Sequence, residues 1–195
     1  MRLFVALDID DHIRGRIARF LDGVRGFAPD VRWVRVESLH VTLKFIGESS
    51  DGDVEKIKQA LERIEAGMIE LNFRGYGFFP GARAPRVFWA GIEAELKLTA
   101  LATAVDEMLV SLHIPKEEHA FSPHLTLARG AGGSGSPRNQ KSDGPNRSFQ
   151  HLHEKLAALP APEFGTMTAR EFFLYQSRLL PGGSKYLKLA GFGLR

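Results

Sequence analysis

One short pattern occurs twice in this chain and constrains its fold more than any other feature. It reads HVTL at residues 40–43 and HLTL at residues 124–127. Each copy lies in an apolar run typical of a β-strand, where side chains two positions apart point to the same face. Both runs therefore predict a strand with its aliphatic side chains toward a core and its histidine and threonine toward the opposite face.

The order of predicted elements around the two patterns also repeats. Each HxT strand follows a strand and an amphipathic helix, and each half of the chain ends in a Pro-Gly turn, at Pro80 and at Pro181, before a final strand. Two similar units related by a pseudo-twofold axis would explain this order. We expect an α+β fold that is bilobed, with two antiparallel sheets, helices packed outside them, and a central cleft that carries both HxT motifs.

Hydrophobic periodicity predicts the individual elements. Besides the two HxT strands, strands are expected at 2–9, 31–34, 69–79, 86–92, 166–176 and 185–193. Helices are expected at 11–26, 53–66, 95–112 and 148–158. Residues 130–147 are rich in Gly, Ser and Pro and predict a flexible loop within a single domain that spans residues 1–195.

Composition narrows the classes of protein and of site. The 195 residues include no cysteine, which excludes disulfides, thiol nucleophiles and cysteine-bound metals. The net charge of +3 permits an anionic ligand but is too small to indicate binding along a duplex. No run reaches membrane-spanning length and the start does not resemble a signal peptide, so we expect a soluble, cytoplasmic protein that is a monomer.

The paired motifs predict a particular chemistry. An imidazole titrates near neutral pH, so one histidine can take a proton from water while the other gives one to a leaving oxygen. The hydroxyls of Thr42 and Thr126 can donate hydrogen bonds to the nonbridging oxygens of a phosphate. No carboxylate cluster accompanies the motifs, which disfavours a two-metal site. We therefore predict phosphodiester hydrolysis by His40 and His124 without a metal or a cofactor.

Several segments of the chain resemble the two-histidine (2H) phosphoesterase superfamily. They are MRLFVALDI, VRWV, LHVTLKFIG, PRVFWAGI, FSPHLTLAR and LYQSRLLPGGSKYLKLAGF. Within that superfamily the sequence is most similar to bacterial and archaeal RNA 2′,3′-cyclic phosphodiesterases, also known as 2′-5′ RNA ligase-like proteins. The resemblance implies hydrolysis of a terminal 2′,3′-cyclic phosphate, on RNA 3′ ends or small cyclic nucleotides, to a 2′-phosphate. It also implies that His40 is the general acid on the 3′ oxygen and His124 the general base on water.

Two residues at equal offsets from the histidines are candidates for substrate binding. Arg129 matches the arginine that follows the second motif in the family, which implies a phosphate contact. Regular alternation places it on the face opposite His124, unless a bulge or the end of the strand re-aims it. Phe45 has the same offset from His40, and it would either stack on a base or pack in the core.

Other residues receive weaker interpretations. Tyr186 and Arg178 are further candidates for the cleft, while Trp33 and Trp89 are expected in the core or the cleft wall. The remaining histidines are expected to be surface or capping residues, at positions 12, 113, 119, 151 and 153. The polar loop could contact RNA through its basic residues, at positions 138, 141 and 147, or be a disordered insertion.

Three alternatives to metal-free hydrolysis stay open at this point. The same site could work in reverse as a 2′-5′ RNA ligase that joins a 5′-hydroxyl to the cyclic phosphate. The cleft could bind RNA ends without turnover, although two intact HxT motifs speak against this. A metal-dependent hydrolase is the most distant of the three.

Overall fold

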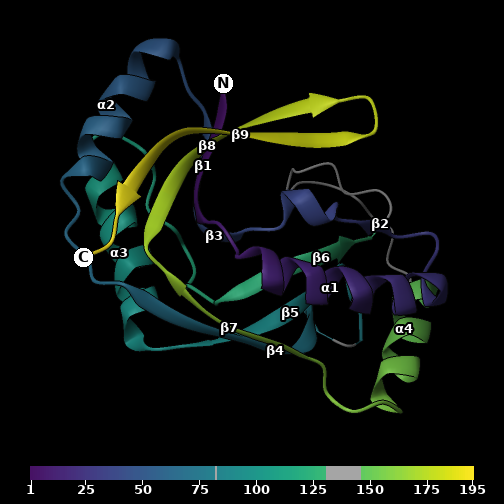
Figure 1. The fold of residues 1–195 in the computed structure, drawn as a ribbon. Coiled ribbons are helices and arrows are strands. Elements are labelled where there is room, and N and C mark those ends of the chain that lie inside the picture. The colour runs from purple at the N-terminus through teal and green to yellow at the C-terminus, as the bar shows by residue number, and fades with distance from the viewer. Residues whose placement is uncertain (82, 131–145) are drawn as a thin grey trace.

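A computed structural model describes residues 1–81, 83–130 and 146–195 (Figure 1). Within these ranges the chain is an α+β protein, as expected, with two antiparallel sheets and four α-helices. The first sheet has the order β3-β1-β8-β9 and the second the order β2-β6-β5-β4-β7. The strands are β1 (Arg2–Leu7), β2 (Arg32–Trp33), β3 (Val41–Glu48), β4 (Ile69–Phe79), β5 (Val87–Ala94), β6 (His124–Arg129), β7 (Glu163–Ala169), β8 (Glu171–Leu180) and β9 (Gly183–Gly193).

The two sheets repeat one order of strands. Each HxT strand, β3 or β6, pairs with the strand that precedes the helix before it, β1 or β5. The next neighbour, β8 or β4, comes from the other half of the chain. Each sheet therefore contains strands from both halves, so neither half of the chain forms its sheet alone.

The helices cross between the halves as well. They are α1 (Asp11–Val24), α2 (Asp51–Glu62), α3 (Leu96–Val110) and α4 (Arg147–Ala157). Helix α1 leads from β1 of the first sheet to β2 of the second and packs on β7 of the second, whereas α3 connects two strands of the second sheet but packs on β3 of the first. Figure 1 shows α2 and α3 together on one side of the molecule, and α1 and α4 on the other.

Local sequence explains where these helices begin and end. Helix α1 buries Ile13, Ile17, Leu21 and Val24, which form one apolar stripe at helical spacing. Helix α2 begins at Asp51, earlier than expected, because the Ser50 side chain and the third helical residue form a capping box. Helices α1, α2 and α3 each end before the last residue of their predicted range, where short 3₁₀ or turn segments take over.

The predicted strand at 166–176 is wrong as a single element. It consists of two strands, β7 and β8, which are separated by Arg170. Strand β7 pairs with β4 in the second sheet, whereas β8 pairs with β1 in the first. The buried positions change from Met167 and Ala169 to Phe172 and Leu174, with Arg170 and Glu171 both exposed between them, so the alternation is interrupted where the pairing partner changes. This segment joins the two sheets along one side of the molecule (Figure 1).

Most of the predicted loop at 130–147, including its candidate RNA contacts at positions 138 and 141, lies outside the described residues. Its two ends are described. The amide of Gly130 donates to the carbonyl of Arg86, and the Asn146 side chain accepts from the Phe149 amide and caps α4. Arg147, the third candidate RNA contact, is the first residue of that helix. In the part of the chain that is described, no helix has the length and apolar character needed to cross a membrane.

Most buried side chains form one apolar core that draws on both sheets and on all four helices, and Phe4, Ala6 and Tyr175 form a second, smaller cluster. Two charged residues lie inside the larger core. The ammonium of Lys44, on β3, donates to the Asp106 carboxylate on α3 at 2.6 Å and to the Pro115 carbonyl at 2.9 Å. Lys44 is 2% exposed and Asp106 8% exposed, and the pair links β3 to the segment that leads toward β6. The Glu117 carboxylate lies 3.5 Å from the same ammonium.

This ion pair predicts a large and specific stability loss. Asp106→Ala leaves the Lys44 ammonium buried with only Glu117 as a charged partner, and we expect the free energy of unfolding to fall by about 3 kcal/mol. Urea unfolding measures the loss. Glu55→Ala, which removes the partner of the surface residue Lys58, is the matched control and should cost less than about 0.5 kcal/mol. Similar losses in the two variants would contradict the prediction.

Candidate active site

A β-bulge in β3 decides which of its side chains face the candidate site. Ala6 of β1 pairs with Thr42 and Val5 pairs with Lys44, so Leu43 is an extra residue on β3. After the bulge Phe45 pairs with Phe4. Since Phe4 and Ala6 are two positions apart on β1, Thr42 and Phe45 lie on the same face of the sheet.

Strand β6 carries a bulge at the equivalent position. Trp89 of β5 pairs with Thr126 and Phe88 pairs with Ala128, which leaves Leu127 as the extra residue. Arg129 then pairs with Val87, two positions from Trp89, and therefore lies on the face of Thr126. Regular alternation would have placed Arg129 on the opposite face, and the bulge is the reason that it does not.

The two histidines are oriented by the same hydrogen bond. Nδ1 of His40 lies 2.8 Å from the carbonyl oxygen of Ser38, and Nδ1 of His124 lies 2.7 Å from that of Ser122. Because a carbonyl oxygen only accepts, each Nδ1 must carry its proton. Each Nε2 is then the ring nitrogen that can exchange a proton with a substrate, whether the imidazole is neutral or charged.

Arg129 interacts electrostatically with both histidines. The Arg129 guanidinium is close enough for its positive charge to lower the pKa of both imidazoles. Tyr186 of β9 packs edge-on against the His40 ring at 5.1 Å between centroids, and it also interacts electrostatically with Arg129. Strands β3 and β6, which belong to different sheets, contact each other here. Thr42 and Thr126 are both half-buried on these facing strands.

Burial is the main influence on the protonation of both imidazoles. It lowers the pKa of His40 to about 4, against the opposing effect of the Ser38 carbonyl, and Arg129 lowers it further. Burial also lowers the pKa of His124, again with a contribution from Arg129. The loss of water disfavours the charged ring, so both histidines are neutral near pH 7 in the free protein. Each Nε2 then presents a lone pair.

An aromatic shell surrounds each histidine. Phe4 and Tyr175 lie 4.7 and 6.3 Å from the His40 ring between centroids. Phe79 lies 4.9 Å from the His124 ring, and Trp89 packs on Phe79. The sequence analysis missed Phe4, Tyr175 and Phe79. Alternation in β1 does indicate Phe4, because Leu3, Val5 and Leu7 occupy the core face and leave Phe4 to the other.

The remaining candidates divide between the site and other parts of the molecule. Trp89 lies beside His124 as part of the wall, whereas Trp33 donates to the Ala28 carbonyl and packs on Phe88 at the edge of the core. Phe45 is 57% exposed, so core packing is ruled out for it. Arg178 pairs across the β8–β9 hairpin with Lys185 and is exposed.

The other histidines lie outside the site. His113 has a positive φ of 62° directly after α3, as the expected capping role requires, and His12, His119 and His151 are exposed. His153, on α4, packs edge-on against Phe78. Across the described ranges, no three His, Asp or Glu side chains come together as a set that could hold a metal ion.

Comparisons with known proteins identify the family of this chain. The model of the LigT-like phosphoesterase family matches residues 7–89, a stretch that contains the first HxT motif. An RNA 2′,3′-cyclic phosphodiesterase of Archaeoglobus fulgidus is 33% identical over 192 residues, which are 98% of this chain and 99% of that protein. The chain belongs to the LigT-like phosphoesterase family. The family resemblance inferred from the sequence is thereby confirmed.

Solved structures of LigT-like proteins share the fold over the whole chain. A crystal structure from Thermus thermophilus has a TM-score of 0.78 at 28% identity and covers 100% of this chain and 98% of its own. The structure of Escherichia coli LigT complexed with 3′-AMP has a TM-score of 0.76 at 26% identity and covers 99% of this chain and 97% of its own. The two-sheet fold is therefore common to these phosphoesterases.

The electrostatics of the site predict a titration that can be measured directly. In the free protein we expect the His40 imidazole to titrate with a midpoint at about 4, and His124 to titrate below the ordinary value of 6.5. NMR of the ring protons across pH measures both midpoints. A His40 midpoint at or above 6.5 would contradict the prediction.

The same shift has a consequence for stability with a definite sign. Between about pH 6.5 and 4 the unfolded chain binds a proton that folded His40 does not. Stability should therefore fall as the pH drops through this window, by up to about 1.4 kcal/mol per pH unit for this residue. Urea unfolding at each pH gives the slope, and His40→Asn should reduce it.

Proposed function

We propose that this LigT-like phosphoesterase hydrolyses a 2′,3′-cyclic phosphate, at the 3′ end of RNA or on a small nucleotide, to a 2′-phosphomonoester without a metal ion. The observation that carries the proposal is the matched pair of imidazoles. Each has Nδ1 bound to a main-chain carbonyl and Nε2 left for chemistry, and both lie within the field of Arg129. The proposed site is a central cleft between two halves related by a pseudo-twofold axis.

The reaction requires one proton to be removed and another to be delivered. Nε2 of His124 takes a proton from water while the water oxygen attacks phosphorus. The bond between phosphorus and the 3′ oxygen breaks, and Nε2 of His40 gives its proton to that oxygen. The products are a 2′-phosphate and a 3′-hydroxyl, and the two histidines have exchanged protonation states. The division of roles between the histidines follows the family resemblance.

The threonines and Arg129 act on the charge of the phosphate in this proposal. The hydroxyls of Thr42 and Thr126 approach the phosphate from opposite strands and donate to its nonbridging oxygens. Negative charge on those oxygens grows in the transition state, so fixed donors lower the barrier. The Arg129 guanidinium adds a positive charge from the same face of β6 as Thr126.

The low pKa of His40 in the free protein has a place in this mechanism. A general acid must be protonated when the substrate is bound, yet free His40 is neutral near pH 7. The substrate brings a negative phosphodiester next to the imidazole and offsets the charge of Arg129, which raises the His40 pKa. Binding of the substrate thus favours the protonated form of His40, which acts as the general acid. His124 is neutral at the start of the reaction and can accept a proton.

The nucleotide itself has a proposed platform. Phe45 is exposed at the edge of the aromatic shell, with its ring 6.2 Å from that of Phe4, and a base can stack on it. Relatives support a nucleotide ligand: the A. fulgidus protein is an RNA 2′,3′-cyclic phosphodiesterase, and the E. coli LigT structure is a complex with 3′-AMP. Stacking on one face accommodates any base.

Removal of either imidazole tests the catalytic pair. We expect His40→Ala and His124→Ala each to lower kcat for a 2′,3′-cyclic nucleotide by about 10²- to 10⁴-fold, because each removes one proton transfer. Circular dichroism should show that both variants stay folded. His151→Ala removes an exposed imidazole on α4 and serves as the control with unchanged kcat. Full activity in either site variant would refute the mechanism.

Analysis of the product tests the reaction and its independence of metal. A short RNA that ends in a 2′,3′-cyclic phosphate is incubated with the protein in EDTA, and the product is identified by ³¹P NMR. We expect a 2′-phosphomonoester at the same rate with and without EDTA. A 3′-phosphate, loss of activity in EDTA, or joining to an added 5′-hydroxyl RNA as the main reaction would each count against the proposal.

A further inference from the structure

Arg14 lies at the junction of three segments near His40. From α1 its guanidinium donates to the Val36 carbonyl at 2.5 Å, to the Ile9 carbonyl at 3.2 Å and to the Asp8 carboxylate at 2.8 Å. A longer bond of 3.5 Å reaches the Leu39 carbonyl. Its side chain is 17% exposed. One guanidinium thus joins the end of β1 to the turn that precedes β3, and its fixed fork of donors matches these acceptors.

That turn is the one that orients His40. Residues Val36–Ser38 form a short 3₁₀ helix, and the Ser38 carbonyl within it accepts the Nδ1 proton of His40. Arg14 binds the carbonyls of Val36 and Leu39 on either side of Ser38. Since the two bound carbonyls flank the one that holds the imidazole, the direction of the Ser38 carbonyl depends on Arg14.

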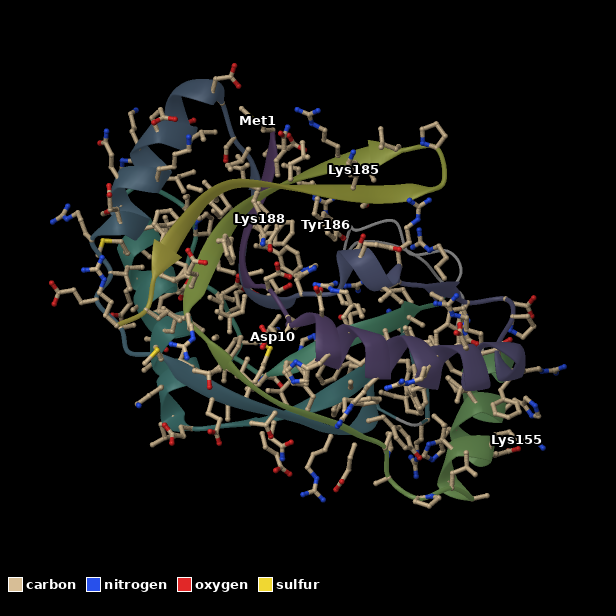
Figure 2. All side chains as sticks on the ribbon, viewed as in Figure 1. Met1, Asp10, Lys155, Lys185, Tyr186 and Lys188 are labelled. Carbon is tan, nitrogen blue, oxygen red and sulfur yellow. The ribbon has the colours of Figure 1, made fainter. Side chains whose placement is uncertain are left out.

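A second layer of charge holds Arg14 in place. The Asp8 carboxylate accepts from Arg14 through one oxygen and from the Lys188 ammonium through the other. Lys188 also lies over the Phe173 ring, 4.1 Å from its centroid. Figure 2 shows Lys188 and Tyr186 along β9, with the start of α1 below them. The guanidinium is therefore fixed from the side of β1 as well as from the turn.

Arg14 acts on His40 at a distance. Both residues line one cavity of about 330 Å³, together with Asp8, Tyr175 and Tyr186. Among the described residues no direct hydrogen bond joins the guanidinium to the imidazole: the charge of Arg14 lowers the His40 pKa from a distance, and its effect on the position of the ring passes through the turn. The described ranges also show no side chain that binds carbonyls on both sides of Ser122, so the arrangement is particular to the first motif.

We propose that Arg14, held by Asp8, is a positioning residue for His40. By fixing the 36–39 turn it keeps Nδ1–H on the Ser38 carbonyl and Nε2 directed at the leaving 3′ oxygen. Its role as an aid to catalysis rests on the proposed function, in which His40 delivers the proton. A proton donor displaced by about 1 Å can lower the rate by as much as about 100-fold, so control of this turn has a measurable effect.

Three variants and one control test the proposal. Arg14→Gln removes the charged fork, Arg14→Lys keeps the charge but cannot span the turn and Asp8 together, and Asp8→Asn weakens the hold on Arg14. Arg19→Gln changes an exposed arginine one turn and a half further along α1 and is the control. Rates are measured on a 2′,3′-cyclic nucleotide, and long-range ¹H–¹⁵N NMR reports which ring nitrogen of His40 carries the proton.

We expect Arg14→Gln to lower kcat by about 10- to 100-fold with little change in KM, since substrate binding does not use the turn. His40 should change from a pure Nδ1–H form to a mixture of tautomers, while His124 keeps its own. Arg14→Lys should remain impaired, and Arg19→Gln should match the unmodified protein in both measurements. If Arg14→Gln does not fold, Arg14→Lys and Asp8→Asn provide the same comparison.

The proposal requires both effects together. An unchanged His40 tautomer, or an unchanged kcat, in folded Arg14 and Asp8 variants would overturn it. Disturbance of the His124 signals to the same extent as those of His40 would also overturn it, because the effect would then be general. If the unmodified protein does not hydrolyse the cyclic nucleotide, the proposed function fails. The tautomer comparison still decides whether Arg14 positions His40.

Discussion

One extra residue at the same position of each HxT strand determines which of its later side chains face the core and which face the candidate site. The bulges at Leu43 and Leu127 place two consecutive side chains on the core side of each strand. In β3 the second of these is Lys44, and its burial explains why Asp106 of α3 is retained inside the core. Beyond each bulge the next side chain returns to the opposite face. Core packing and the composition of the site are thus consequences of the same two insertions.

The two histidines share their orientation but differ in their surroundings. Main-chain carbonyls fix both rings in the same tautomer. His40 is enclosed by Phe4, Tyr175 and Tyr186. The charge of Asp8 raises its pKa and the charge of Arg14 lowers it. A nearly symmetric backbone therefore carries an asymmetric environment. Two identical groups require such a difference if one is to release a proton while the other takes one.

Alternation along the strands was enough to predict much of the site. The His-x-Thr spacing predicted which side chains share a face, and the duplicated motif predicted two equivalent strands, as the matching registers of β3 and β6 now show. The positions of the bulges were beyond reach, because the run from Val41 to Ile46 looks the same with or without an unpaired residue, and a bulge was only one of two ways to re-aim Arg129. The change of sheet did leave a trace, since Arg170 and Glu171 are consecutive exposed residues that interrupt the alternation, but this trace does not identify the new partner strand. Pairing partners are a long-range property that local alternation does not encode.

Arg14 illustrates a different limit of sequence reasoning. On its own helix it is one of several polar residues beside an apolar stripe, and nothing in the α1 pattern separates it from Arg16 or Arg19. Its partners come from two other segments, at residues 8–9 and 36–39, that only the folded chain brings together around it. A charged side chain that holds backbone segments together is recognised by the hydrogen-bond acceptors around it. The amino-acid sequence does not show which acceptors lie nearby.

The packing of α3 on the opposite sheet has a mechanical consequence. Because α3 connects two strands of the second sheet but packs on β3 of the first, the two sheets cannot separate without pulling this helix out of the shared core. Many enzymes that bind a ligand between two lobes close on it by a hinge, and here the interlocked connections oppose such a motion. The packing of α3 across the two sheets thus opposes any change in the spacing of β3 and β6, the two strands of the HxT motifs.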